Sequence, residues 1–177
     1  GEINFLSSQQ VNVGAETVKG YDAAAIYAFD VMDLRATLNA SVTYLKDYTI
    51  VPFPGGAPII YRGHIGGGNG GYPKWRGLSS LTLDDAKWTA SYTIQWIGRA
   101  TDFNAAPTAL GYRTPNVFYH NAQFAYRLLE DATVAVGVDN IFEEDAPYLP
   151  SFTDGNTDTF VYDLVGRRGY VRLTYKF

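Results

Sequence analysis

Residues 166–177 read GRRGYVRLTYKF, and this segment decides how the rest of the chain is interpreted. Its apolar and aromatic side chains stand at alternate positions: Val171, Leu173, Tyr175 and Phe177. Successive side chains of a strand point to opposite faces, so one face here is apolar and the other is polar and basic. A soluble sheet would bury the apolar face, whereas a transmembrane barrel strand would turn it toward lipid. The segment alone allows both.

The composition narrows the class of protein. Hydrophobic residues make up 46% of the 177 residues, yet no apolar run approaches the roughly 20 residues of a transmembrane helix. A membrane protein of this sequence must therefore be a β-barrel. The absence of cysteine excludes a disulfide framework and any thiolate metal site. A net charge of −4 argues against a nucleic-acid partner.

Period-2 alternation predicts a series of strands joined by alternately short and long connections. The predicted strands are 17–29, 35–48, 75–83, 87–99, 117–128, 132–140 and 166–177, preceded by a partial strand at 2–8. Short connections fall at 30–34, 84–86 and 129–131, and long ones at 49–72, 101–116 and 141–164. This asymmetry is typical of outer-membrane barrels, which have short periplasmic turns and long extracellular loops. A periplasmic C-terminus would put every short turn on the periplasmic side.

The strand at 87–99 carries the clearest alternation, and Trp88 and Trp96 stand near its two ends. Eight residues of a tilted strand put these rings about 20 Å apart along the membrane normal, close to the spacing of two aromatic girdles. Trp88 and Trp96 are therefore predicted girdle residues. A soluble domain would not expose Trp88, Tyr92 and Trp96 as one continuous stripe.

Together these features predict an all-β fold, an antiparallel transmembrane β-barrel. Bacterial single-chain barrels have even strand numbers, and closure needs the first strand to pair with the last. Seven full strands and one polar stub predict that residues 1–177 form the C-terminal seven to eight strands of a larger barrel domain. The alternatives are a complete small outer-membrane barrel, acting as an anchor or adhesin, and a soluble β-barrel or sandwich enzyme.

Several sequence blocks resemble the C-terminal region of the TonB-dependent outer-membrane receptors. In chain order they are Gly20-Tyr21-Asp22, Ala40 to Tyr44, Pro73 to Arg76, Gly137-Val138-Asp139-Asn140-Ile141-Phe142, Gly166-Arg167 and Tyr175-Lys176-Phe177. Their order and spacing match over essentially the whole chain. No single block is decisive, because many outer-membrane barrels share a terminal phenylalanine after an alternating strand, but the combination is specific.

The resemblance implies a 22-stranded barrel with an N-terminal plug domain and a TonB box, neither of which is present in this sequence. It implies active import of a scarce nutrient across the outer membrane of a Gram-negative bacterium, energised through TonB. Siderophore-bound iron, cobalamin and carbohydrates are all candidate substrates. The expected partners are outer-membrane lipid and lipopolysaccharide, the plug and remaining strands, the TonB complex, the barrel assembly machinery and the small-molecule substrate.

The resemblance also gives the terminal strand a role in assembly. The alternating residues Val171, Leu173, Tyr175 and Phe177 are expected to be read by the barrel assembly machinery. Deleting Phe177 should then impair insertion into the membrane, and unchanged outer-membrane levels of the deleted protein would contradict this.

The first long connection holds the candidate substrate contacts Tyr61, Arg62 and His64. The glycine-rich run at 64–71 lacks the Gly-Lys-Ser/Thr ending of a phosphate loop and opens no helix, so it is read as a mobile outer loop and not as a nucleotide site. No arrangement of Ser, His and Asp predicts catalysis, and neither a cofactor nor a resident metal is predicted.

Spacing and strand parity also predict the surroundings of other charged residues. Asp154, Asn156 and Asp158 have the spacing that opens a calcium loop, but Thr159 and Val165 replace the glycine and the glutamate of an EF-hand, so only a loose Ca²⁺ site stays open. From its position in the strand alternation, His120 is predicted to face lipid at the outer interface. Arg167 is predicted to face lipopolysaccharide phosphates at the outer rim. The same alternation predicts that five cations face the lumen: Arg35, Lys87, Arg127, Arg168 and Arg172.

Overall fold

The chain's regular structure is entirely β in a computed structural model that describes residues 14–66, 70–152 and 155–177. Seven long strands form one sheet: β1 (Ala15–Val31), β2 (Leu34–Val51), β5 (Trp75–Asp84), β6 (Trp88–Ile97), β8 (Val117–Arg127), β9 (Ala132–Asp139) and β10 (Arg168–Tyr175). Three two-residue strands lie in the connections: β3 (Ile59–Ile60), β4 (His64–Ile65) and β7 (Thr101–Asp102). Within these described ranges, no helix is long and apolar enough to span a membrane.

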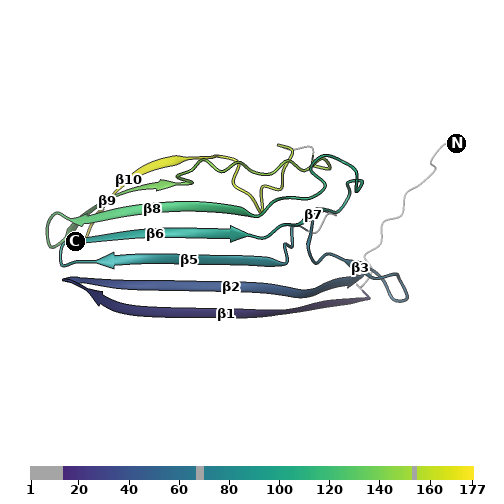
Figure 1. Ribbon diagram of the computed structural model, residues 1–177, viewed down its shortest axis with the longest axis horizontal. Coiled ribbons are helices and arrows are strands. Elements are labelled where there is room, and N and C mark those ends of the chain that lie inside the picture. Colours follow the sequence, from purple (N-terminus) through teal and green to yellow (C-terminus); the bar gives the residue numbers. More distant parts are fainter. Residues whose placement is uncertain (1–13, 67–69, 153–154) are drawn as a thin grey trace.

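The long strands run up and down in sequence order. Each pairs antiparallel with its neighbour in the order β1-β2-β5-β6-β8-β9-β10, and β3 adds to the end of β2. Figure 1 shows β1 and β10 at the opposite edges of this sheet. No pairing joins those two edges within the described residues, so the sheet is open.

The connections alternate in length as the sequence predicts. The short turns after β1, β5 and β8 gather at one end of the sheet, together with the C-terminus, and the long connections gather at the other (Figure 1). The backbone N–H of Lys176 donates to the carbonyl of Asp131, 2.9 Å away, which holds the chain end beside the last short turn.

Strand boundaries differ from the prediction in places with physical causes. The first hairpin is longer than expected because a β-bulge absorbs Lys46, so that pairing continues past it to Ala15 and Val51. The turn predicted at 84–86 lies at 85–87. The predicted partial strand at 2–8 falls outside the described residues.

The register gives the sheet two chemically distinct faces. One row across its middle joins Tyr27, Leu38, Leu81, Tyr92, Ala122 and Val138, and belongs to what we call the apolar face. The neighbouring row on the other side, the polar face, joins Ala28, Thr37, Thr82, Ser91 and Gln123. Strand alternation thus separates the two kinds of side chain across the middle of the sheet.

The structure explains why two residues of the block at 137–142 are a glycine and an asparagine. A Cβ on Gly137 would lie 2.3 Å from Cζ of Tyr170, so only glycine leaves room for that ring to cross the strand. The Tyr170 hydroxyl then donates to Gln123 Oε1 at 2.9 Å. Asn140 ends β9 with a left-handed φ of 51°. Its Nδ2 donates to the carbonyl of Glu144, and its Oδ1 accepts from the Glu144 N–H.

Candidate binding site on the polar face

The long connections fold back onto the polar face and build a hydrophobic cluster there. Ile97, Val117 and Tyr119 extend from the ends of β6 and β8, and they pack with residues of the connections: Ile65, Ala100, Leu149, Val161 and Tyr162. All eight side chains are buried. The end of the polar face that carries the long connections is therefore covered by packed chain, and burial of apolar surface holds its shape.

A buried carboxyl group ties two of these connections together. Asp102 of β7 is 1% exposed, and its Oδ2 accepts from the backbone N–H of Ser151 at 3.0 Å. Its Oδ1 accepts from the Asn104 N–H at 3.1 Å and from the Ser151 hydroxyl. Since β7 is itself paired with β4, Asp102 links all three long connections at one point.

A cavity of about 400 Å³ lies beside this cluster and is lined mainly by polar groups. The strands contribute Gln95, Tyr119, Asn121 and Asp139, while Asp163 and Arg168 come from the connection and the start of β10. Neutral amides and hydroxyls on a rigid sheet are suited to orienting a small polar ligand.

The charges around this cavity are largely paired. Arg168 Nη2 lies 2.9 Å from Asp163 Oδ2, and its Nε lies 3.9 Å from Asp139 Oδ2. Burial raises the pKa of Tyr162 to about 12, so its hydroxyl stays protonated and donates to Thr114 Oγ1 at 3.3 Å. The arrangement can bind polar groups, and we see in it no nucleophile activated by a neighbouring base.

Comparison with known proteins identifies the family. A family model described as TonB dependent receptor-like, beta-barrel, matches residues 1–141. The chain belongs to this family. A search of curated protein sequences finds no match. Among solved structures, a mutant of the ferric enterobactin receptor PfeA of Pseudomonas aeruginosa aligns with a TM-score of 0.60 at 16% identity. The alignment covers 92% of this chain and 22% of that receptor, and it shows a common fold.

The family confirms the predicted fold class and membership. TonB-dependent receptor barrels are proteins of the bacterial outer membrane, where the apolar outer surface meets lipid and the polar surface lines the lumen. The sheet is then a section of barrel wall, not closed in this chain, with its polar face toward the lumen. Four of the cations assigned to the lumen by parity do lie on that face, namely Arg35, Arg127, Arg168 and Arg172, while Lys87 lies in a short turn.

The structure keeps two of the three predicted substrate contacts together, Tyr61 and His64, and places Arg62 apart from them. Tyr61 is buried and stacks on Phe103, with ring centroids 5.4 Å apart. His64 packs edge-on against the same ring at 5.6 Å, and its Nδ1 has no hydrogen-bond partner within the described residues. Arg62 instead turns to the apolar face, where its Nη2 donates to the Tyr44 hydroxyl at 3.0 Å. Their role in substrate contact stays a prediction.

The two predicted girdle tryptophans lie at opposite ends of β6. Trp96 belongs to a row of rings that crosses five strands of the apolar face near the long connections, the aromatic row: Tyr21, Tyr44, Trp75, Trp96 and Phe118. Trp88 stacks on Phe124 near the short-turn end, with centroids 5.8 Å apart. The sequence revealed the tryptophans of β6 but not the cross-strand row, which depends on register.

The terminal strand presents its predicted signal residues on the apolar face. Val171, Leu173 and Tyr175 alternate along β10 and are exposed, and Phe177 follows the strand. Their reading by the assembly machinery stays a prediction.

The remaining candidates have local partners. The His120 Nδ1 lies 2.8 Å from the Tyr92 hydroxyl on the apolar face. Arg167 Nη2 lies 2.9 Å from Glu143 Oε2. Asp154 of the possible calcium loop lies outside the described residues, and Asp158 is buried, accepting from the Phe160 N–H. No cluster of His, Asp and Glu suited to a metal ion occurs in the part of the chain that the structure describes.

Proposed function

We propose that this chain is part of the barrel of an outer-membrane receptor that imports an iron chelate of the siderophore class. The observation that carries the proposal is the rigid, polar cavity of about 400 Å³ on the luminal side, under connections packed onto the barrel wall. A siderophore receptor among the similar folds favours this class over cobalamin and carbohydrates. The proposal includes no catalytic step and no resident cofactor.

In this proposal the short-turn end and the C-terminus face the periplasm, and the long connections face the outside. The remaining strands pair with the two free edges, β1 and β10. A plug domain fills the lumen and couples to the TonB complex. The barrel assembly machinery reads the terminal strand, and the open edges argue against a complete small barrel acting as an anchor or adhesin.

The proposal is tested by uptake of iron-55 chelates in iron-starved cells that produce the full natural polypeptide. Chelate uptake is expected to depend on the receptor gene and to stop when the proton gradient is collapsed. Uptake of radiolabelled cobalamin and of radiolabelled maltodextrin is measured in the same cells, as substrates of the two other classes. Receptor-dependent uptake of either one, with no uptake of any iron chelate, would contradict the siderophore assignment.

The cavity itself is tested by filling it. Thr159 lines the cavity and is exposed, so Thr159→Trp should block it without disturbing the hydrophobic cluster. We expect the Kd of the chelate to rise at least tenfold, which corresponds to a loss of about 1.4 kcal/mol in binding free energy. Thr108→Trp makes the same exchange at an exposed position of another connection and should leave the Kd unchanged. Equal changes of the Kd in the two variants would show that the cavity is not part of the binding site.

A further inference from the structure

The polar cavity of about 400 Å³ on the luminal side holds one more carboxylate than it has cations to pair with it. Three charged side chains are among its lining residues, those of Asp139, Asp163 and Arg168. Arg168 binds Asp163 through two parallel contacts, Nη2 to Oδ2 at 2.9 Å and Nη1 to Oδ1 at 3.4 Å. The Arg168 Nε lies 3.9 Å from Asp139 Oδ2, which is too far for a hydrogen bond. The guanidinium is thus committed to Asp163.

Asp139 is therefore the available acceptor of this cavity. It ends β9 directly opposite Arg168, on the polar face of the sheet, and its side chain is 38% exposed. Its carboxylate makes no hydrogen bond within the described residues, and Gln95 and Asn121, which line the cavity beside it, are uncharged. A carboxylate placed in this way attracts a cationic group on a ligand, because opposite charges interact strongly where protein partly excludes water.

An exposed aromatic ring lies at the same cavity. Phe160 is 92% exposed, and it lines the cavity from the connection between β9 and β10. The Asp158 Oδ1 accepts from the Phe160 N–H at 2.9 Å, and the Asp158 carbonyl accepts from the N–H groups of Val161 and Tyr162. Asp158, Val161 and Tyr162 are buried, so the turn is fixed from below while the ring of Phe160 stays uncovered. Such a ring face is available to a ligand and attracts cations.

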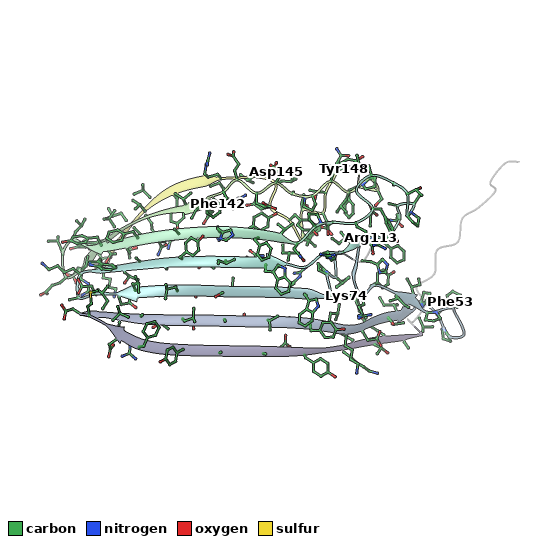
Figure 2. All side chains as sticks on the ribbon, in the orientation of Figure 1. Phe53, Lys74, Arg113, Phe142, Asp145 and Tyr148 are labelled. Atoms are coloured by element: carbon green, nitrogen blue, oxygen red, sulfur yellow. The ribbon has the colours of Figure 1, made fainter. Side chains whose placement is uncertain are left out.

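The charge of the surrounding connection acts in the same direction. Residues 141–164 carry six carboxylates and no lysine, arginine or histidine. The summed field of such a segment draws cations toward the cavity and disfavours anions. Three cations of the other connections, Lys74, Arg99 and Arg113, line a different cavity, where β5 begins. Figure 2 shows Lys74 and Arg113 at that end of the sheet.

We propose that this cavity binds a protonated amine carried by the imported chelate, with Asp139 as its counter-ion. The Asp139 carboxylate accepts charge-assisted hydrogen bonds from the ammonium group, and the ring of Phe160 lies against the same cation. A primary alkylammonium has a pKa of about 10.4 and is charged at neutral pH. The inference rests on the proposed function, and it names a chemical group on the substrate of that cavity.

The test compares the ferric complexes of two linear tris-hydroxamate ligands, one ending in a free primary amine and the other N-acetylated at that amine. Three hydroxamate groups balance the charge of Fe³⁺, so only the first complex is cationic. The Kd of each is measured by isothermal titration calorimetry with the full natural polypeptide in non-ionic detergent. The wild type is expected to bind the amine complex about tenfold more tightly, which corresponds to about 1.4 kcal/mol. The Asp139→Asn variant should bind both complexes with the same Kd.

Two further variants separate contact in the cavity from the general negative field. Asp145→Asn removes the same charge from an exposed position of the same connection that does not line the cavity, and it should change the preference less than twofold. Phe160→Leu keeps an apolar side chain without an aromatic face, and it should lower the preference roughly threefold.

Two outcomes would overturn the amine site. One is an equal Kd of the two complexes in the wild type, and the other is an equal loss of preference in Asp139→Asn and Asp145→Asn. Failure of the wild type to bind either complex would instead contradict the proposed siderophore class, and the inference would fall with it.

Discussion

Replacing Asp102 with alanine is expected to release the connection between β9 and β10 from the end of the sheet that carries the long connections. The carboxyl group is buried and accepts hydrogen bonds from both the backbone and the hydroxyl of Ser151. Its removal leaves these donors without an acceptor in a site closed to water, at a cost of about 3 kcal/mol. Hydrogen exchange of the Ser151 amide should then accelerate roughly a hundredfold, if exchange occurs through local opening.

The matched control is Asp145→Ala in the same connection. Asp145 is exposed and makes no hydrogen bond or ion pair within the described residues, and Figure 2 shows it along that connection. In this variant the Ser151 amide should exchange at the wild-type rate. The Asp102→Asn variant keeps one acceptor oxygen, so its exchange rate at Ser151 should lie between those of the Asp102→Ala and Asp145→Ala variants. An exchange rate at Ser151 that is equal in all three variants would show that the hydrophobic cluster alone holds the connection.

The alternation of the sequence was sufficient to predict the strands and the order of short and long connections, and the resemblance of its sequence blocks predicted the family. Period 2 is a local property, so 87–99 could be read as a strand without knowledge of its neighbours. Register is not local. A turn at 84–86 would put Thr82 opposite Trp88, whereas the observed turn puts Leu83 opposite Ala90. The row of rings that crosses the strands, from Tyr21 to Phe118, depends on this register and therefore could not be predicted from the pattern.

The packed connections were missed for a different reason. The segment 141–164 reads as acidic and polar, and its apolar residues Leu149, Val161 and Tyr162 show no period. They become a cluster only when the chain folds back over Ile97 and Val117. The long connection predicted at 49–72 likewise gave no sign of a core, yet its residues Tyr61 and Ile65 are buried. Contacts between distant segments decide burial here, and no local signal in the sequence predicts them.

An arginine introduced at Leu81 should prevent stable insertion, whereas one introduced at Thr82 should be tolerated. Leu81 lies on the apolar face opposite Leu38 and Tyr92, in the row midway between Trp88 and Trp96 on β6. A charge facing lipid at the bilayer midplane destabilises a barrel by about 2–4 kcal/mol. Thr82 is the next residue of the same strand and faces the lumen side, where a cation stays hydrated.

The measurement is the level of folded protein in the outer membrane, together with urea unfolding in lipid vesicles. Leu81→Arg should lower the free energy of unfolding by the amount expected at the midplane, and Thr82→Arg should change it by less than about 1 kcal/mol. Both exchanges add one charge to adjacent positions of β5, so net charge and strand propensity are closely matched. A reversed order of the two effects would mean that the apolar face does not meet lipid.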